Sequence, residues 1–444
     1  MPKRAVVLGA GASGEAFAAA LSRLAPETQI TVVEHELVGG ECSYWACIPS
    51  KTMLRPLEVH ARALLAPGVA GAVKGVDLAE VFRWRDEQAG KDDTSQAEWL
   101  EGLGAKLVRG TAVVERPGVV TVDGRELPYD DLLVATGSLP TLPPLEGLDA
   151  LDHWGSREAT SAYEAPRSLV VVGGGAVGCE LAQFYARAGS DVTLVQNGEH
   201  LLPRMDPEAA EILADALRAD GVDLRLGDRG KSVEGGDGAP YRLELVRGEV
   251  VEGEQLLVAT GRRPNVEGLD LAALGATVEG GGIRTDDRLC AAQGVWAAGD
   301  VTGVALFTHV GKYQGRIAAA NVAGQDRRAD YRAIPAAVFT DPQVAAVGDT
   351  SGENAVVSRW KLERVSRMGT FQNPKKPGLL KLYADSERKV LVGATAVGPE
   401  AGEWLGQLTL AVRARVPVDV LRDTIQPFPT FSEAIYFAAR DLPV

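Results

Sequence analysis

The chain has 444 residues, of which 45% are hydrophobic and 24% charged, and its 46 basic and 60 acidic residues give a net charge of -14. This length is typical of two or three domains, and the negative charge excludes the basic surface that binding to nucleic acid or an anionic membrane requires. No apolar run is long enough to span a bilayer and four cysteines are too few for a secreted disulfide scaffold, so we expect a cytoplasmic protein.

The chain opens with the pattern of a dinucleotide-binding unit: a buried strand, a glycine turn, a helix and a second strand, at residues 5–8, 9–14, 15–24 and 30–33. Gly9 permits the tight turn, Gly11 lets the backbone approach a pyrophosphate, and Gly14 lets the helix pack on the strand. The diphosphate then lies at the amides of the helix N-terminus. Glu34 ends the second strand, at the position where an acidic side chain hydrogen-bonds a ribose.

A pair of cysteines follows at the entrance to a predicted helix. Cys42 and Cys47 can reach disulfide distance. The helix dipole favours the thiolate of Cys47, and Lys51 lies on the same helical face, which is a redox arrangement. The alternatives are two buried free cysteines or half of a metal site, and no histidine near the pair has zinc-ligand spacing. We favour redox use and expect no metal; the other two cysteines, Cys179 and Cys290, are predicted to be buried and inert.

The opening pattern returns in the middle of the chain. A strand, a glycine turn, a helix ending near residue 188 and a second strand occupy residues 169–195, with glycines Gly173, Gly175 and Gly178 and with Gln196 at the end of the second strand. The sequence therefore predicts two dinucleotide-binding units.

Each unit has a later strand that ends in Ala-Thr-Gly, at residues 132–137 and 256–261, which indicates duplication of one fold. Between these motifs, residues 112–122 and 224–251 alternate in polarity and predict small antiparallel insertions on parallel sheets.

The last third of the chain changes in character. The predicted elements are a strand at 294–300, a helix at 313–322, strands at 336–339, 379–383 and 390–397, and a helix at 402–415. We place a third, α+β domain from about Ile334 onward. The expected fold is α/β, with two Rossmann-like domains and a C-terminal α+β domain; the predicted boundaries are 1–150, 151–268, 269–333 (a return to the first domain) and 334–444.

Together these motifs resemble the FAD-dependent pyridine nucleotide-disulfide oxidoreductases, a family that includes dihydrolipoamide dehydrogenase, glutathione reductase and mercuric reductase. The resemblance covers nearly the whole chain, because its motifs stand in family order at residues 39–51, 135–137, 173–178, 259–265, 299–300, 307–310, 313–316 and 338–342.

The resemblance implies that the first unit binds FAD, the second binds a nicotinamide dinucleotide, and the C-terminal domain forms a homodimer with an active site shared across the interface. The residues implied to contact the cofactors are Gly9, Gly11, Gly14, Glu34, Gly40, Lys51, Thr136, Gly137, Gly173, Gly175, Gly178, Gln196, Gly261, Arg262, Gly299 and Asp300.

It also implies roles for the cysteine pair and its neighbours. Cys47 is the thiolate beside the flavin, and Cys42 is the outer thiol that exchanges with substrate. Lys51, near the flavin N5, pairs with Glu180 and stabilises negative charge on the flavin. The alternative for Lys51 and Glu180 is a surface ion pair between two helices.

The chain departs from the family at its C-terminal motif, where Phe428 replaces the histidine that acts as acid and base in thiol exchange. Glu433, which would orient that histidine, is retained; it is either a carboxyl with a raised pKa that serves as the acid, or a surface or capping residue. The phenylalanine resembles the 2-ketopropyl-coenzyme M oxidoreductase/carboxylase branch in part.

Two further departures concern aromatic residues and the nicotinamide site. Tyr44 and Trp45, beside the outer thiol, either pack in the interior or stack on a planar substrate, and packing is favoured. Gln196 is neither the acid that favours NAD nor the arginine that favours NADP, so we expect NAD(P)H, with NADPH favoured because an acidic repeller is absent.

The leading functional hypothesis is an FAD enzyme that transfers hydride from NAD(P)H to the Cys42–Cys47 pair and on to a small disulfide, thioether or related electrophile. One alternative is a diaphorase or quinone reductase that does not need the cysteines. Others are reductive carbon–sulfur cleavage of the 2-ketopropyl-coenzyme M type and, least favoured, a redox sensor without turnover.

Overall fold

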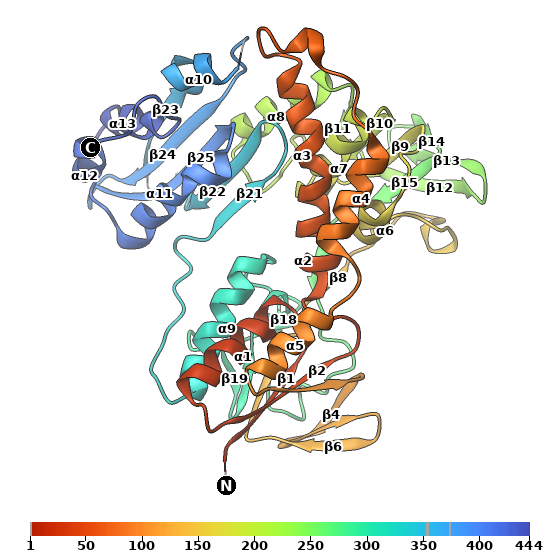
Figure 1. The fold of residues 1–444 in the computed structure, drawn as a ribbon, viewed down its shortest axis with the longest axis vertical. Coiled ribbons are helices and arrows are strands. Elements are labelled where there is room, and N and C mark those ends of the chain that lie inside the picture. The colour runs from red at the N-terminus through yellow and green to blue at the C-terminus, as the bar shows by residue number, and fades with distance from the viewer. Residues whose placement is uncertain (1, 352–354, 373) are drawn as a thin grey trace. The chain divides into compact units, whose positions relative to one another are not determined.

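The computed structural model describes residues 2–351, 355–372 and 374–444 (Figure 1). Its contacts divide the chain into two compact units, each assembled from three segments. The first unit comprises Met1–Pro49, Asp86–Thr141 and Gly261–Asp330. The second comprises Ser50–Arg85, Leu142–Thr260 and Tyr331–Val444.

The first unit is built on a six-stranded sheet in the order β19-β20-β7-β1-β2-β3, parallel except for β19. Its strands are β1 (Arg4–Leu8), β2 (Gln29–Glu34), β3 (Lys106–Arg109), β7 (Asp131–Val134), β19 (Cys290–Ala292) and β20 (Val295–Ala297). Val7 of β1 packs in one hydrophobic cluster and Val6 in another. Because both faces of β1 are covered, its sequence is continuously apolar.

Helices cover one face of this sheet, and small strands cover the other. The helices of the region are α1 (Ala12–Leu24), α2 (Gly40–Tyr44), α5 (Thr94–Gly102) and α9 (Thr308–Val322), with α3 (Cys47–Ala63) and α4 (Leu78–Ala89) leading to and from the second unit. The small strands are β4 (Ala112–Arg116), β5 (Val119–Val122), β6 (Arg125–Pro128), β8 (Ser138–Pro140), β16 (Arg262–Pro264), β17 (Val278–Glu279) and β18 (Gly282–Ile283). The close packing of helices α1 and α9 requires glycine at position 315. A Cβ on Gly315 would lie 2.4 Å from the Ser13 carbonyl oxygen.

The second unit contains a four-stranded parallel sheet in the order β11-β10-β9-β15 and a separate antiparallel sheet, β12-β13-β14. The bounds are β9 (Ser168–Val172), β10 (Asp191–Gln196), β11 (Asp223–Leu226), β12 (Gly230–Gly236), β13 (Ala239–Leu245), β14 (Val250–Gly253) and β15 (Gln255–Val258), with helices α6 (Ser156–Ser161), α7 (Ala176–Arg187) and α8 (Pro207–Ala219). The expectation that the insertion begins at Leu224 is wrong, because β11 pairs in parallel with β10 as the edge strand of the main sheet.

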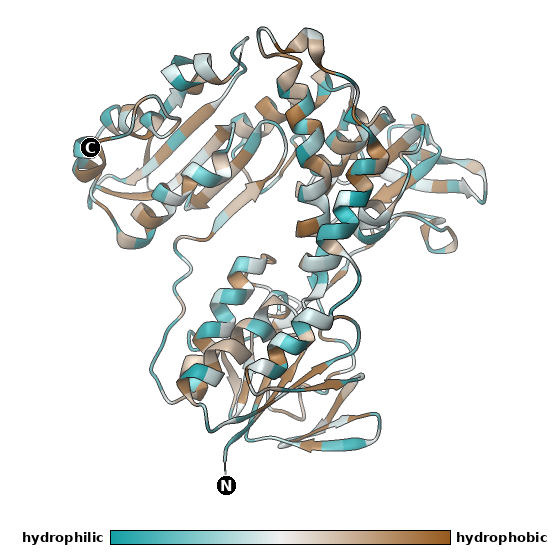
Figure 2. Ribbon diagram, in the orientation of Figure 1, coloured by the Kyte–Doolittle hydropathy of each residue, from teal (hydrophilic) through white to brown (hydrophobic). Residues whose placement is uncertain are grey.

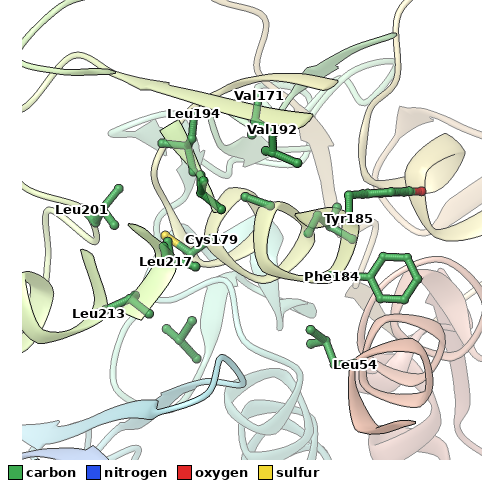
Figure 3. Packing of buried hydrophobic residues seen from close by; sticks show 14 of the residues in the cluster. Leu54, Val171, Cys179, Phe184, Tyr185, Val192, Leu194, Leu201, Leu213 and Leu217 are labelled. Atoms are coloured by element: carbon green, nitrogen blue, oxygen red, sulfur yellow. The ribbon is translucent and has the colours of Figure 1, made fainter. Parts of the chain in front are cut away.

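Helix α7 is the centre of the largest hydrophobic cluster of this unit (Figure 3). Phe184 and Tyr185 are fully buried, and the Tyr185 hydroxyl donates a hydrogen bond to the Ala159 carbonyl. Cys179 lies in the same cluster and is buried, as predicted, and this burial raises the pKa of its thiol. The burial predicted for Cys290 is wrong, because that residue is only half-buried.

The C-terminal part of the second unit is a five-stranded antiparallel sheet in the order β21-β22-β25-β24-β23. Its elements are β21 (Pro335–Val338), β22 (Gln343–Gly348), β23 (Ala355–Lys361), β24 (Leu379–Asp385), β25 (Val390–Gly398), α10 (Ser366–Phe371), α11 (Ala401–Ala414), α12 (Val418–Asp423) and α13 (Glu433–Arg440). Figure 2 shows longer hydrophobic stretches on the strands and mixed colouring on the helices, as amphipathic helices require. Lys381 of β24 donates to both oxygens of Asp206, the N-cap residue of α8, and so links β24 to the start of α8.

The predicted α/β class and the α+β C-terminal region are confirmed. The main difference lies in α9, which begins at Thr308 rather than at Tyr313. Among the described residues, no helix combines the length and the apolar character needed to cross a membrane.

Candidate functional site

The first glycine turn is tightly constrained at two of its three glycines. Gly9 has a φ of +100°, and a Cβ there would lie 2.4 Å from the Ala135 carbonyl oxygen. A Cβ on Gly14 would lie 2.0 Å from the Gly9 carbonyl oxygen, whereas the nearest atom to a Cβ on Gly11 is 3.9 Å away. Gly9 and Gly14 therefore shape the turn, while Gly11 leaves room beside the backbone.

Glu34 closes this turn from the end of β2. Its carboxylate is buried and accepts hydrogen bonds from the backbone amides of Ala10 and Glu36, each at 2.8 Å. A carboxylate has about four acceptor positions, so two amides leave capacity for ribose hydroxyls.

The cysteine loop is fastened to the same turn. The Gly39 amide donates to the Ala10 carbonyl at 2.8 Å, and Gly39 forms a β-bridge with Gly11. A Cβ on Gly40 would lie 2.9 Å from the Gly11 Cα, so this approach requires glycine. The loop therefore starts at the turn that would hold the diphosphate.

Cys42, in the short helix α2, and Cys47, the first residue of α3, form a disulfide. The Thr308 hydroxyl lies 2.6 Å from the Cys42 Sγ and 3.7 Å from the Cys47 Sγ. Thr308 belongs to the motif at residues 307–310, which contributes to the family resemblance and was assigned no role of its own. No local signal assigns it to the cysteines, because it lies more than 260 residues away along the chain.

The two aromatic residues of the cysteine loop are buried, in agreement with a packing role. Their rings meet edge to face, with centroids 5.5 Å apart, and the Tyr44 hydroxyl donates to the Val38 carbonyl at 2.7 Å. Since Trp45 is also buried, neither ring is presented as an open stacking surface.

Asp300, after β20, lies in a small polar cluster with Ser138 and Arg262. The Ser138 hydroxyl donates to the Asp300 carboxylate at 2.6 Å, and the Arg262 guanidinium donates to the Ser138 hydroxyl at 2.8 Å. Burial raises the pKa of Asp300, against the opposing effects of Ser138 and Arg262. Arg262 also pairs with Glu41 of α2 at 3.4 Å, which links this cluster to the cysteine loop.

Four further residues of the first unit are predicted to contact a cofactor, namely Thr136, Gly137, Gly261 and Gly299. Thr136 donates its hydroxyl to the Asn265 carbonyl at 2.6 Å, and Gly137 and Gly261 have positive φ values of +74° and +125°. A Cβ on Gly299 would lie 2.3 Å from the Ser13 hydroxyl, so Asp300 is held close to the start of α1.

These residues fit an FAD. The glycine turn, the acidic residue after β2 and the buried carboxylate of Asp300 offer backbone amides and carboxylate acceptors, which match a diphosphate and the hydroxyls of ribose and ribityl groups. All of them belong to the first unit, together with the disulfide.

The second glycine turn repeats the geometry of the first within the second unit. A Cβ on Gly173 would lie 2.5 Å from the Ala259 carbonyl oxygen, and one on Gly178 would lie 1.9 Å from the Gly173 carbonyl oxygen. Gly175, the N-cap residue of α7, has no atom within 4 Å of that position. The turn therefore leaves space for a second diphosphate.

Gln196 occupies the position that corresponds to Glu34. Its side-chain oxygen accepts from the Gly174 amide at 2.9 Å, and its side-chain nitrogen donates to the His200 carbonyl at 3.4 Å. The glutamine thus closes the turn without introducing a negative charge.

Lys51 and Glu180 form an ion pair with a 2.7 Å separation between Nζ and Oε2. The Glu180 side chain is only 6% exposed and that of Lys51 is 33% exposed, so the alternative of a surface ion pair is not supported. The other Glu180 oxygen accepts from the Phe339 amide at 2.8 Å, and the Phe339 ring centroid lies 4.9 Å from the ammonium. Phe339 therefore contacts both Glu180 and Lys51, and the sequence alone does not identify it as a site residue.

The C-terminal motif lies on a short segment before α13. Phe428 is 73% exposed and the nearby Ile425 is 95% exposed. Glu433 is the first residue of α13, and its carboxylate accepts from the Thr430 amide at 3.4 Å. The Thr430 amide lies before the helix, whose N-cap residue is Ser432.

Comparison with known proteins shows which family the chain matches. The family described as pyridine nucleotide-disulphide oxidoreductase matches residues 3–326, and its dimerisation domain matches residues 334–439. The chain is 36% identical to a dihydrolipoyl dehydrogenase of Thermus scotoductus, over 98% of this chain and 96% of that protein. It is 32% identical to a mercuric reductase of Bacillus cereus, over 98% of this chain and 70% of that protein.

Solved structures give the same result for the fold. The crystal structure of LpdA from Mycobacterium tuberculosis matches with a TM-score of 0.88 and 29% identity, over 99% of both chains. The flavoprotein disulfide reductase RclA from Escherichia coli matches with a TM-score of 0.86, over 99% of both chains, and at 24% identity this likeness concerns the fold alone.

Proposed function

The chain belongs to the pyridine nucleotide-disulphide oxidoreductase family, and from this membership we propose that it uses NAD(P)H to reduce a small disulfide, thioether or related electrophile through FAD and Cys42–Cys47. The observation that carries the proposal is the Cys42–Cys47 disulfide on a loop bonded to the first glycine turn. A disulfide fixed beside a dinucleotide turn is positioned for electron transfer rather than for stabilising a distant part of the fold.

The chain's own residues divide the work as follows. When bound, a flavin accepts a hydride from a nicotinamide and passes on two electrons. The first glycine turn, Glu34 and Asp300 would hold the FAD. Cys47 receives the electrons and Cys42 exchanges with the substrate. Lys51, positioned by Glu180, stabilises negative charge that develops during the transfer.

Thiol exchange in this chain proceeds without the C-terminal histidine of the family. A phenyl ring cannot carry a proton, so Phe428 supplies shape and excludes water instead. Large exposed apolar side chains on a dimerisation domain are typical of a surface covered in an oligomer. We therefore propose a homodimer in which Phe428 borders the partner's site.

The nicotinamide preference follows from Gln196. A carboxylate at this position would repel the 2′-phosphate of NADPH, and the glutamine removes that repulsion while keeping the hydrogen bond to Gly174. We propose that NADPH is preferred over NADH.

The test is anaerobic titration of the FAD-loaded protein with NADPH, followed by counting of thiols with a chromogenic disulfide reagent. One equivalent of NADPH should expose two additional thiols in the wild type and in the control variant Cys290→Ser. Cys42→Ser should abolish disulfide reduction, whereas Cys290→Ser should reduce disulfides like the wild type. Disulfide turnover that survives Cys42→Ser and Cys47→Ser would refute the proposal, and quinone turnover that survives alone would favour the diaphorase alternative.

A further inference from the structure

The Thr308 hydroxyl is the donor in its contact with Cys42. Neither sulfur of a disulfide carries a hydrogen, so at 2.6 Å only the threonine O–H can donate. The same hydroxyl lies 3.7 Å from the Cys47 Sγ. A hydroxyl is thus already aimed at the outer sulfur before any reduction takes place.

The backbone of Thr308 is held firmly in this place. Thr308 is the first residue of α9, where the helix dipole also favours negative charge nearby. A Cβ on Gly315 would lie 2.4 Å from the Ser13 carbonyl oxygen, so α9 lies close against the backbone of α1. Packing of the two helices therefore fixes the hydroxyl relative to the cysteine loop.

We propose that Thr308 is a catalytic residue whose hydroxyl donates a hydrogen bond to the thiolate of Cys42, which keeps this thiol reactive in a chain that lacks the C-terminal histidine. The proposal rests on the proposed role of Cys42 as the exchanging thiol. A hydrogen bond to the charged form lowers the pKa of a thiol, and the thiolate is the attacking species.

The reaction balances without a proton leaving Thr308. Two electrons convert the disulfide into the thiolates of Cys42 and Cys47. The Cys42 thiolate attacks one sulfur of a substrate disulfide, forms a mixed disulfide and releases the first substrate thiolate. The Cys47 thiolate then attacks the Cys42 Sγ of the mixed disulfide, which releases the second substrate thiolate and restores the Cys42–Cys47 bond.

Other charged or titratable groups near the pair stay unchanged in the test. They are Glu41 next to Cys42, with its partner Arg262, Lys51 one turn along α3, and His309 next to Thr308. Their contribution to the thiol pKa is common to all variants, so a difference between variants reports the hydroxyl at position 308.

The experiment measures the Cys42 pKa in the FAD-loaded protein after chemical reduction with a phosphine. Alkylation of Cys42 by iodoacetamide is followed by peptide mass spectrometry as a function of pH, and Cys290 in the same digests is the internal control. Thr308→Val should raise the Cys42 midpoint by about one to two pH units, the loss expected for one hydrogen bond to a charged group. Thr308→Ser should stay close to the wild type, and Cys290 should not shift in any variant.

An unchanged Cys42 midpoint in Thr308→Val would overturn the proposal, and so would a shift of the same size in Thr308→Ser. If Thr308→Val does not retain FAD, Thr308→Ala gives the same comparison with less apolar bulk. Because the reduction is chemical, the result does not depend on NADPH or on an acceptor. An unchanged midpoint therefore counts against Thr308 alone, whereas a failed NADPH titration counts against the proposed function.

Discussion

Replacing Glu180 with glutamine should slow NADPH-dependent turnover about 5- to 30-fold without loss of the fold. The amide keeps an oxygen that can accept from the Phe339 backbone amide, now at 2.8 Å. What it loses is the negative charge that faces the Lys51 ammonium at 2.7 Å. The variant therefore isolates the electrostatic positioning of Lys51.

The magnitude follows from the burial of the pair. Two unit charges about 4 Å apart attract by about 4 kcal/mol at an effective dielectric constant of about 20. Desolvation of the buried carboxylate and the one-third exposure of the Lys51 side chain (33%) reduce the net coupling to about 1–2 kcal/mol. At about 1.4 kcal/mol for each factor of ten, this coupling corresponds to the stated loss in rate.

The assay is steady-state kcat/KM in a double-mutant cycle with Lys51→Met. If Glu180 acts through Lys51, the double variant should be no slower than Lys51→Met alone. The matched control is Glu244→Gln, which breaks an ion pair with Lys231 of the same 2.7 Å length on an exposed hairpin and should leave kcat/KM unchanged. Additive losses in the cycle, or a wild-type rate for Glu180→Gln, would refute the reasoning.

Three further predictions address the cofactor sites and the stability of the second unit. Gln196→Glu should lower the NADPH-to-NADH ratio of kcat/KM by about 10- to 100-fold, since like charges cost several kcal/mol; an unchanged ratio would contradict it. Gly14→Ala should lose both FAD and folding stability, by about 1–3 kcal/mol in denaturant unfolding, whereas Gly11→Ala should lose FAD but keep its fold. Burial tends to raise the pKa of Asp206, but the hydrogen bonds from Lys381, Tyr383 and the Ala209 amide, with the Lys381 charge, together outweigh it and hold the pKa below its usual range. Asp206→Asn should therefore be less stable than the wild type at neutral pH by about 1–3 kcal/mol, and this gap should close as the pH falls below about 4 in pH-dependent unfolding; a constant gap would count against this ion pair.

Local patterns account for most of the fold. The apolar run of β1 and the glycine turn after it are signals within a few residues, and both recur in the second unit. The alternating sequence of β11 predicts an antiparallel strand, although β11 is the edge strand of a parallel sheet. An edge strand has a solvent-facing side, so its sequence resembles that of an antiparallel strand. The early start of α9 was missed because Gly311 and Gly315 lower helix propensity, and their role in packing against Ser13 is visible only in three dimensions.

The candidate site was predictable where its residues are neighbours in sequence. The proximity of Cys42 and Cys47 followed from their spacing. The partners of these residues did not, because Thr308 reaches the cysteines only through the packing of α9 on α1. Phe339 likewise reaches Glu180 from a distant strand end, through a backbone amide that carries no sequence signature.

The two glycine turns separate the folding role of the residue that ends the second strand from its recognition role. Glu34 accepts from the Ala10 amide at 2.8 Å, and Gln196 accepts from the Gly174 amide at 2.9 Å. One oxygen is enough to close the turn, so the charge of the group is not needed for the fold. Because the closing bond is the same in both cases, we expect that exchange between an amide and a carboxylate at position 196 changes the nicotinamide specificity without disturbing the turn.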